Sequence, residues 1–262
     1  MSVFLTLEIE VFGDIQVVTL NRPNAANALN TQMGLDLVSY FERASLLEVR
    51  LDCIVLTGAG DKAFCAGGDL KERDGMIAAA WENQHLIFER MARAIRDCPI
   101  PTIAAVNGAA YGGGCEIAAL CDFVYASEQA RFALPEASLG IIPGAGGTQT
   151  LPRAMGERRA KEILLSAQPF TAQEAATWGL VNRVTPHADL MESVLDVARR
   201  IGANAPLAVR RAKQAVHVGS QLSLADGMAF EIEAYNRLVS TDDRVEGIQA
   251  RNEKRPPRFS GK

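Results

Sequence analysis

The sequence contains few residues that could form disulfides or bind metal ions. Its five cysteines are odd in number and include no Cys-x-x-Cys pair, and its three histidines lie far apart. Neither a disulfide framework nor a metal site is therefore expected. We expect the cysteines to be reduced thiols, mostly in the core of a cytoplasmic protein. They are Cys53, Cys65, Cys98, Cys115 and Cys121.

Basic charge is also scarce. The 31 aspartates and glutamates outnumber the 27 lysines and arginines, which gives a formal net charge of -4. Because a non-specific nucleic-acid binder normally carries an excess of cations, no nucleic-acid partner is expected. The N-terminus shows no signal-peptide or presequence pattern, and Asn107, Glu116 and four glycines interrupt the apolar stretch 103–120. We therefore expect a soluble chain with no membrane partner.

The apolar content is sufficient for a large core. Hydrophobic residues make up 48% of the 262 residues and charged residues 22%, which is typical of one large α/β unit. Strand-like and helix-like segments alternate, which predicts an α/β fold with buried parallel strands. The expected strands are 3–11, 16–20, 53–56, 102–106 and 123–126, and the expected helices are 30–48, 83–97 and a segment from the glycines at 112–114 through 120.

From about Glu157 onward the pattern is almost wholly helical. We predict an α/β core over residues 1–205 and a helical region over 206–262, starting near Pro206. No low-complexity linker separates the two regions. The helical region should therefore pack on the core or on a neighbouring subunit.

Three glycine-rich segments need an explanation. They are 65–69 (Cys-Ala-Gly-Gly-Asp), 111–116 (Tyr-Gly-Gly-Gly-Cys-Glu) and 143–149 (Pro-Gly-Ala-Gly-Gly-Thr-Gln). None fits the Gly-x-Gly-x-x-Gly pattern or a P-loop, and each alone could be a tight turn. The first two, however, follow predicted apolar strands and put free backbone N–H groups near a helix start. Two such amides that converge on one point would form an oxyanion hole.

Two glutamates lie in apolar surroundings near these segments. Glu116 belongs to an apolar helix, and Glu136 follows the apolar run 132–135. Either glutamate alone would more often be a surface or capping residue. A pair of carboxylates near an anion hole, however, suits general acid-base chemistry on a water molecule.

Taken in order, these segments resemble the crotonase, or enoyl-CoA hydratase/isomerase, superfamily. The resemblance also includes the segments 20–23 (Leu-Asn-Arg-Pro), 57–72, 101–108 and 253–257 (Glu-Lys-Arg-Pro-Pro), so it covers nearly the whole chain. It implies a spiral α/β core of repeated ββα units. It also implies that the C-terminal helices join subunits into a homotrimer or a homohexamer.

The resemblance also implies roles for individual residues. The N–H groups of Gly68 and Gly113 would form the oxyanion hole, although hydratases often have alanine in place of Gly68. Glu116 and Glu136 would hold and activate water, with Gly144 helping to place it. The substrate and its CoA would contact Ala66, Gly67, Gly68, Asp69, Leu70, Lys71 and Gly113.

The activity implied is the addition of water to a trans-2-enoyl-CoA, which gives a 3-hydroxyacyl-CoA. The acyl-CoA is the expected partner, and no metal or separate cofactor is expected because CoA arrives with the substrate. Segments 70–73 and 241–247 favour a short-chain or methylglutaconyl-CoA-type substrate, and segment 73–88, with Met76, Ile77 and Trp81, is expected to line the acyl pocket. The alternatives are an enoyl-CoA isomerase, another thioester-enolate reaction, or an RNA-binding or scaffold role.

Overall fold

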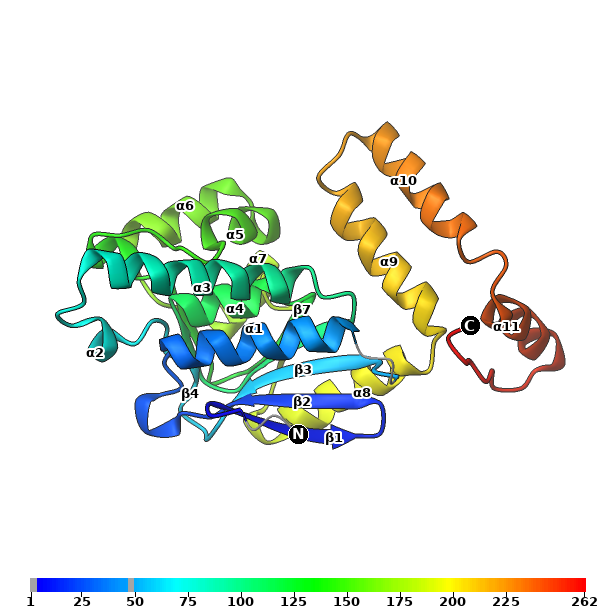
Figure 1. The fold of residues 1–262 in the computed structure, drawn as a ribbon, viewed down its shortest axis with the longest axis horizontal. Coiled ribbons are helices and arrows are strands. Elements are labelled where there is room, and N and C mark those ends of the chain that lie inside the picture. Colours follow the sequence, from blue (N-terminus) through cyan, green and yellow to red (C-terminus); the bar gives the residue numbers. More distant parts are fainter. Residues whose placement is uncertain (1–3, 47–49) are drawn as a thin grey trace.

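The structure, a computed structural model, describes residues 4–46 and 50–262. The expected strand 3–11 and the expected helix 30–48 therefore each extend at one end outside the described residues. Two β-sheets form the centre of the fold, and helices surround them (Figure 1). Within the described ranges, no helix combines the length and the apolar content that crossing a membrane requires.

The larger sheet has six strands in the order β1-β2-β3-β5-β7-β10. These strands are β1 (Leu7–Phe12), β2 (Ile15–Leu20), β3 (Cys53–Gly58), β5 (Thr102–Val106), β7 (Phe123–Ser127) and β10 (Arg183–Thr185). β1 and β2 form an antiparallel hairpin, and the other neighbouring pairs are parallel. β3 and β5 are buried along their whole length, which explains the run of four apolar residues in each.

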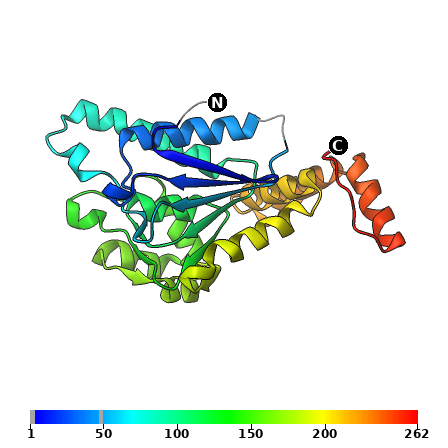
Figure 2. The same ribbon diagram turned by 90° about the horizontal axis from the view of Figure 1, so that it is seen from below.

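Helices cover both faces of this sheet. Cys53 and Val55 of β3 pack in one cluster with helix α8 (Leu190–Gly202). The alternate residues of β3 point the other way, into the main core with α1 (Thr31–Leu46) and α3 (Ala78–Arg96). Figure 2 shows α1 and α8 on opposite sides of the strands. This layering makes the larger sheet a rigid support for the loops that leave its strands.

A smaller sheet has the order β4-β6-β8-β9. Its strands are β4 (Ala63–Cys65), β6 (Ala109–Tyr111), β8 (Arg131–Ala133) and β9 (Phe170–Thr171). β4, β6 and β8 are mutually parallel, and β9 is antiparallel to β8. Each of the three parallel strands starts a few residues after a strand of the larger sheet ends, and helical structure follows it. The chain thus repeats a ββα unit, as the resemblance implied.

The helices that follow these strand pairs surround the candidate segments. They are α2 (Leu70–Arg73), α4 (Gly113–Leu120), α5 (Gly147–Met155), α6 (Glu157–Ser166) and α7 (Ala172–Trp178). α3 starts at Ala78, five residues before the expected start at residue 83, because three consecutive alanines favour helix. The expected helical run after residue 157 is interrupted by β9 and β10, which are too short to show a strand period.

The C-terminal helices extend away from the two sheets (Figures 1 and 2). They are α9 (Pro206–Gly219), α10 (Leu224–Asn236) and α11 (Asp242–Glu253). Pro206 is the first residue of α9, a position at which its fixed φ suits the helix. Several large apolar side chains on α9 and α10 are exposed, among them Val216 (72%), Leu224 (82%) and Met228 (59%). Exposed apolar surface of this kind is typical of interaction sites.

Candidate active site

The smaller sheet brings three of the predicted residues to one edge. Gly68, Gly113 and Glu136 each follow the C-terminal end of one of the parallel strands β4, β6 and β8 by a few residues. The C-terminal ends of parallel strands lie at the same edge of a sheet, where ligands commonly bind. The expectation that strands 53–56 and 102–106 lead into the first two loops needs correction. β4 and β6 intervene, and they precede the loops directly.

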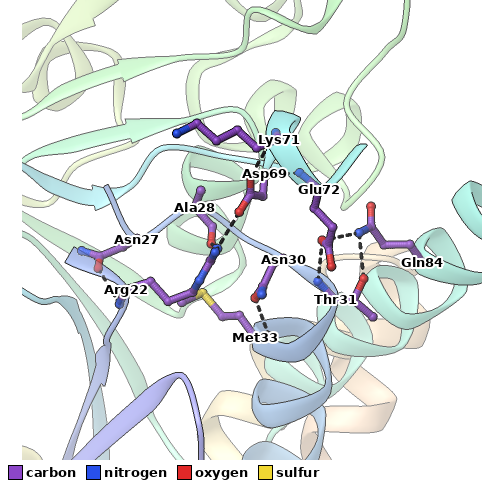
Figure 3. Close-up of polar contacts among 10 residues, drawn as sticks. All are labelled: Arg22, Asn27, Ala28, Asn30, Thr31, Met33, Asp69, Lys71, Glu72 and Gln84. Carbon is purple, nitrogen blue, oxygen red and sulfur yellow. Dashed lines mark hydrogen bonds and ion pairs between the residues drawn. The ribbon is translucent and has the colours of Figure 1, made fainter. Parts of the chain in front are cut away.

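Hydrogen bonds on either side of Gly68 hold its backbone in place. The N–H of Leu29 donates to the Gly67 carbonyl at 2.7 Å, and the N–H of Asp69 donates to the Leu29 carbonyl at 3.0 Å. The carboxylate of Asp69 also pairs with Arg22, at 2.8 Å, and caps α2 (Figure 3). The N–H of Gly68 itself donates to no acceptor in the described part of the chain. A firmly held loop therefore presents a free amide.

Gly113 supplies a second free amide. It is the first residue of α4, and its N–H has no acceptor among residues 4–46 and 50–262. Such N–H groups carry the positive end of the helix dipole. The two loops touch, because a Cβ on Gly67, which has a φ of +93°, would lie 2.7 Å from the carbonyl oxygen of Tyr111. Glycine is required there, and the contact brings the two free amides onto neighbouring loops.

Glu116 is a buried carboxylate fixed by backbone amides. Its Oε1 accepts N–H bonds from Ala145, at 2.8 Å, and from Gly147, at 2.7 Å. Burial raises the pKa of Glu116 above its ordinary value, while these amides and that of Gly144 partly offset the effect. The third glycine-rich segment thus orients this carboxylate and favours its ionised form.

Glu136 has a different environment. Only 8% of the residue is exposed, and its Oε2 is buried with no hydrogen-bond partner in the described structure. Its Oε1 lies where a side chain at Gly112 would lie, 2.9 Å from the position of a Cβ. Burial, with a further contribution from the charge of Glu116, raises the pKa of Glu136 to about 7. A carboxyl group with such a pKa can exchange protons near neutral pH.

A cleft of about 1020 Å³ joins these groups. All five residues predicted for the oxyanion hole and for water activation line it, namely Gly68, Gly113, Glu116, Glu136 and Gly144. The other predicted substrate contacts lie next to it in sequence but do not line it: Ala66, Gly67, Asp69, Leu70 and Lys71. The cleft therefore combines two free amides with two buried carboxyl groups of raised pKa.

The sequence over residues 10–262 matches the enoyl-CoA hydratase/isomerase family. The chain belongs to this family. Its fold agrees with the crystal structure of an enoyl-CoA hydratase from Bacillus anthracis, with a TM-score of 0.96 and 40% identity over 98% of this chain and 100% of that one. The predicted crotonase-like α/β fold is thereby confirmed.

Named relatives in the family are hydratases with different substrates. The chain is 41% identical over 247 residues to the short-chain-enoyl-CoA hydratase of Clostridium acetobutylicum, covering 94% of each chain. It is also 41% identical over 250 residues to the 2,3-dehydroadipyl-CoA hydratase of Escherichia coli, covering 95% of this chain and 96% of that one. The first name states a short acyl chain and the second a dicarboxylic acyl group.

The segment 73–88, expected to line the acyl pocket, contributes Arg73 and His85 to the cleft, although sequence reasoning singled out neither residue. That reasoning expected Trp81, which does line the cleft, together with Met76 and Ile77, which do not. The spacing of Trp81 and His85 on α3 is a signal that could have found His85, because residues four apart share a helix face. No comparable periodicity marks Arg73, which lies at the end of a four-residue helix.

Proposed function

We propose that this enzyme adds water to the double bond of a trans-2-enoyl-CoA and forms a 3-hydroxyacyl-CoA. The observation that carries the proposal is the joint presence of two free amides and two buried glutamates in one cleft. The hydratase names of relatives at about 40% identity support it. No separate cofactor is needed, because CoA is part of the substrate.

The two amides would polarise the substrate. In the proposed complex the thioester oxygen accepts the N–H groups of Gly68 and Gly113, so electron density moves from C3 toward that oxygen. Negative charge grows on the oxygen as water attacks C3, and the amides bind this charge more tightly than the neutral ground state. The loss of one such donor typically costs ~3–4 kcal/mol in barrier height.

The two glutamates would then transfer the protons. Glu116, whose amide bonds favour its ionised form, accepts a proton from water as the oxygen bonds to C3. Glu136, with a pKa near 7, donates its proton to C2 from the same side. One proton leaves water and one reaches carbon, so the glutamate pair contains the same number of protons before and after the reaction.

The test of this proposal follows the enoyl-thioester absorbance as the double bond is consumed. Wild type should hydrate crotonyl-CoA, and both Glu116→Gln and Glu136→Gln should lose at least about 100-fold in rate, since each removes a proton-transfer group. Glu162→Gln, a change of an exposed glutamate on α6, serves as the control and should keep full activity. Isomerisation without hydration by the wild type would reject the proposal.

We also propose that the exposed apolar faces of α9 and α10 join subunits into a trimer or a hexamer. The exposed side chains at Val216, Leu224 and Met228 support this assembly, since exposed apolar surface is unfavourable in water. The expected cytoplasmic location stays a prediction.

A further inference from the structure

The chain between β2 and α1 runs alongside the loop that carries Gly68 (Figure 3). Leu29, in this stretch, forms an isolated parallel β-bridge with Gly68. Its N–H donates to the carbonyl of Gly67 at 2.7 Å, and its carbonyl accepts the N–H of Asp69 at 3.0 Å. The Gly67 carbonyl and the Gly68 N–H belong to one trans peptide unit, so they point in opposite directions. The bridge therefore turns the Gly68 N–H away from Leu29 and leaves it free.

Leu29 also lies against the second proposed oxyanion amide. Its side chain is buried and lines the cleft. A Cβ on Gly113 would lie 3.4 Å from Cδ2 of Leu29. The backbone of Leu29 thus sets the direction of one amide, and its side chain packs beside the residue that supplies the other. The relative placement of the two amides therefore depends on where Leu29 lies.

The turn that leads to Leu29 has an unfavourable backbone conformation. Ala26 and Asn27 have φ values of +50° and +54°, in the left-handed region that favours glycine. Asn27 is fully buried, and its amide donates to the carbonyls of Ala59, at 3.0 Å, and Ala63, at 2.8 Å. Its Oδ1 accepts the N–H of Arg22 at 3.0 Å. Backbone strain of this kind persists only where surrounding contacts enforce it, and it is common at functional sites.

The side chain of Arg22 joins both sides of the bridge. Its Nη1 donates to the Ala28 carbonyl at 2.5 Å, and its Nη2 pairs with Oδ2 of Asp69 at 2.8 Å (Figure 3). Ala28 directly precedes Leu29, and Asp69 directly follows Gly68. The ion pair is mostly buried, so solvent and salt screen it less than an exposed pair. Arg22 does not line the cleft, so any effect on the reaction passes through these two neighbours.

We propose that Arg22 is a positioning residue of the oxyanion hole, which holds the bridge between Leu29 and Gly68 so that the Gly68 N–H points at the thioester oxygen. This inference rests on the proposed hydration activity and adds a residue to its machinery. An oxyanion donor acts where charge develops, so a displaced amide weakens the transition state more than the bound substrate. Loss of Arg22 should therefore lower kcat more than it raises KM.

The first experiment measures the hydrogen bond to the thioester without turnover. Butyryl-CoA with a carbon-13 label at its thioester carbonyl lacks the double bond that hydration needs. Difference infrared spectra should show a lower carbonyl stretching frequency on binding to wild type, because hydrogen bonds to the oxygen weaken the C=O bond. Arg22→Met should move this band back toward its frequency in solution, and Arg22→Lys should retain more of the shift because it keeps the charge opposite Asp69. Arg90→Met, which breaks the exposed pair with Glu42, is the matched control and should keep the full shift.

The second experiment is a double-mutant cycle on crotonyl-CoA hydration. Arg22→Met should lower kcat by about 10- to 100-fold, a part of the 10²- to 10³-fold loss that removal of an oxyanion donor causes. Asp69→Asn removes the charge that Arg22 pairs with but keeps an oxygen that can cap α2. If Arg22 acts through Asp69, the double variant should lose little more activity than Arg22→Met alone.

Three results would overturn the inference. They are an unchanged carbonyl band in Arg22→Met, a loss of activity in that variant that lies wholly in KM, and fully multiplicative losses in the double variant. Should Arg22→Met not fold, Arg22→Lys and Asp69→Asn decide the question, and a wild-type band and kcat in both would reject the proposal. A shifted band in the wild type without any hydration would count against the hydration proposal alone, because the band is measured independently of turnover.

Discussion

The pH dependence of hydration should reveal the protonation state of the glutamate pair. In the proposed mechanism the active pair contains one proton, with Glu116 ionised and Glu136 protonated. Burial raises both pKa values, that of Glu136 to about 7. As pH rises through 7, Glu136 loses its proton and kcat/KM should fall, approaching tenfold for each further pH unit. On the acid side, kcat/KM should fall where Glu116 gains a proton, at a pH above the ordinary glutamate value of about 4.5.

The reverse reaction gives a stringent check. Hydration neither takes up nor releases a proton overall, so its equilibrium constant does not change with pH across this range. The ratio of kcat/KM values for hydration and dehydration must equal that constant. The kcat/KM for dehydration of the 3-hydroxyacyl-CoA should therefore fall at the same acidic and alkaline pH values, although the protons move in the opposite direction. The apparent pKa values obtained from these profiles belong to the coupled glutamate pair rather than to one residue.

Substitution identifies the residue whose deprotonation lowers kcat/KM at alkaline pH. Glu136→Gln should lower kcat/KM by about 10²- to 10⁴-fold, the usual contribution of one acid-base group, and should abolish the break near pH 7. His85 also lines the cleft, so His85→Gln is the control and should retain the break. A break that persists in Glu136→Gln but vanishes in His85→Gln, or a flat wild-type profile between pH 6 and 9, would refute the assignment.

Three further predictions concern the loops and the C-terminal helices. Gly113→Pro removes the N–H at the first position of α4, where proline fits a helix, and should lower kcat by about 10²- to 10³-fold, whereas Gly113→Ala keeps the N–H and should lose far less. Gly67→Ala should lower the free energy of unfolding in urea by about 1–3 kcal/mol, since its φ of +93° and the nearby backbone exclude a methyl group. Gly60→Ala, at a φ of +74° with open space around it, is the control and should cost less. Equal costs would contradict the argument that the Tyr111 carbonyl excludes a side chain at Gly67. Leu224→Glu should lower the mass in analytical ultracentrifugation, because it puts a charge into the proposed subunit interface; an unchanged mass would exclude Leu224 from that interface.

The larger sheet was predictable because its strands have a strong signal. β3 and β5 are buried along their length, and each contains a run of four apolar residues, 53–56 and 103–106. The smaller sheet was not predictable from periodicity, because β4, β6 and β8 have three residues each. A three-residue segment is too short to distinguish a period of 2 from one of 3.6. The pairing of these short strands can be recognised only in the structure, where the larger sheet brings the segments that contain them side by side.

The residues of the candidate site also differ in how far the sequence predicts them. The loops 65–69 and 111–116 could be proposed from sequence because glycine near a predicted helix start has a local meaning, and the resemblance named Gly68 and Gly113 within them. Arg73 was expected only as part of the segment 73–88, since its position depends on Gln84, eleven residues further along on a different helix. Gln84 is itself held by Thr31, from a third helix. A contact among three helices has no signature in the order of residues along the chain.

The environments of the two glutamates support an assignment of base and acid that the residue order alone does not make. Both carboxyl groups are buried, so burial alone would raise both pKa values and would not distinguish them. The difference lies in their partners: Glu116 accepts backbone N–H groups from Ala145 and Gly147, which favour its ionised form, whereas Glu136 accepts its own backbone N–H and leaves Oε2 without a partner in the described structure. If the pair contains a single proton, that proton should therefore reside on Glu136. Groups whose surroundings separate their proton affinities act as base and acid respectively. In the proposed mechanism, the amides of the third glycine-rich segment thus decide which glutamate accepts a proton from water and which donates one to C2.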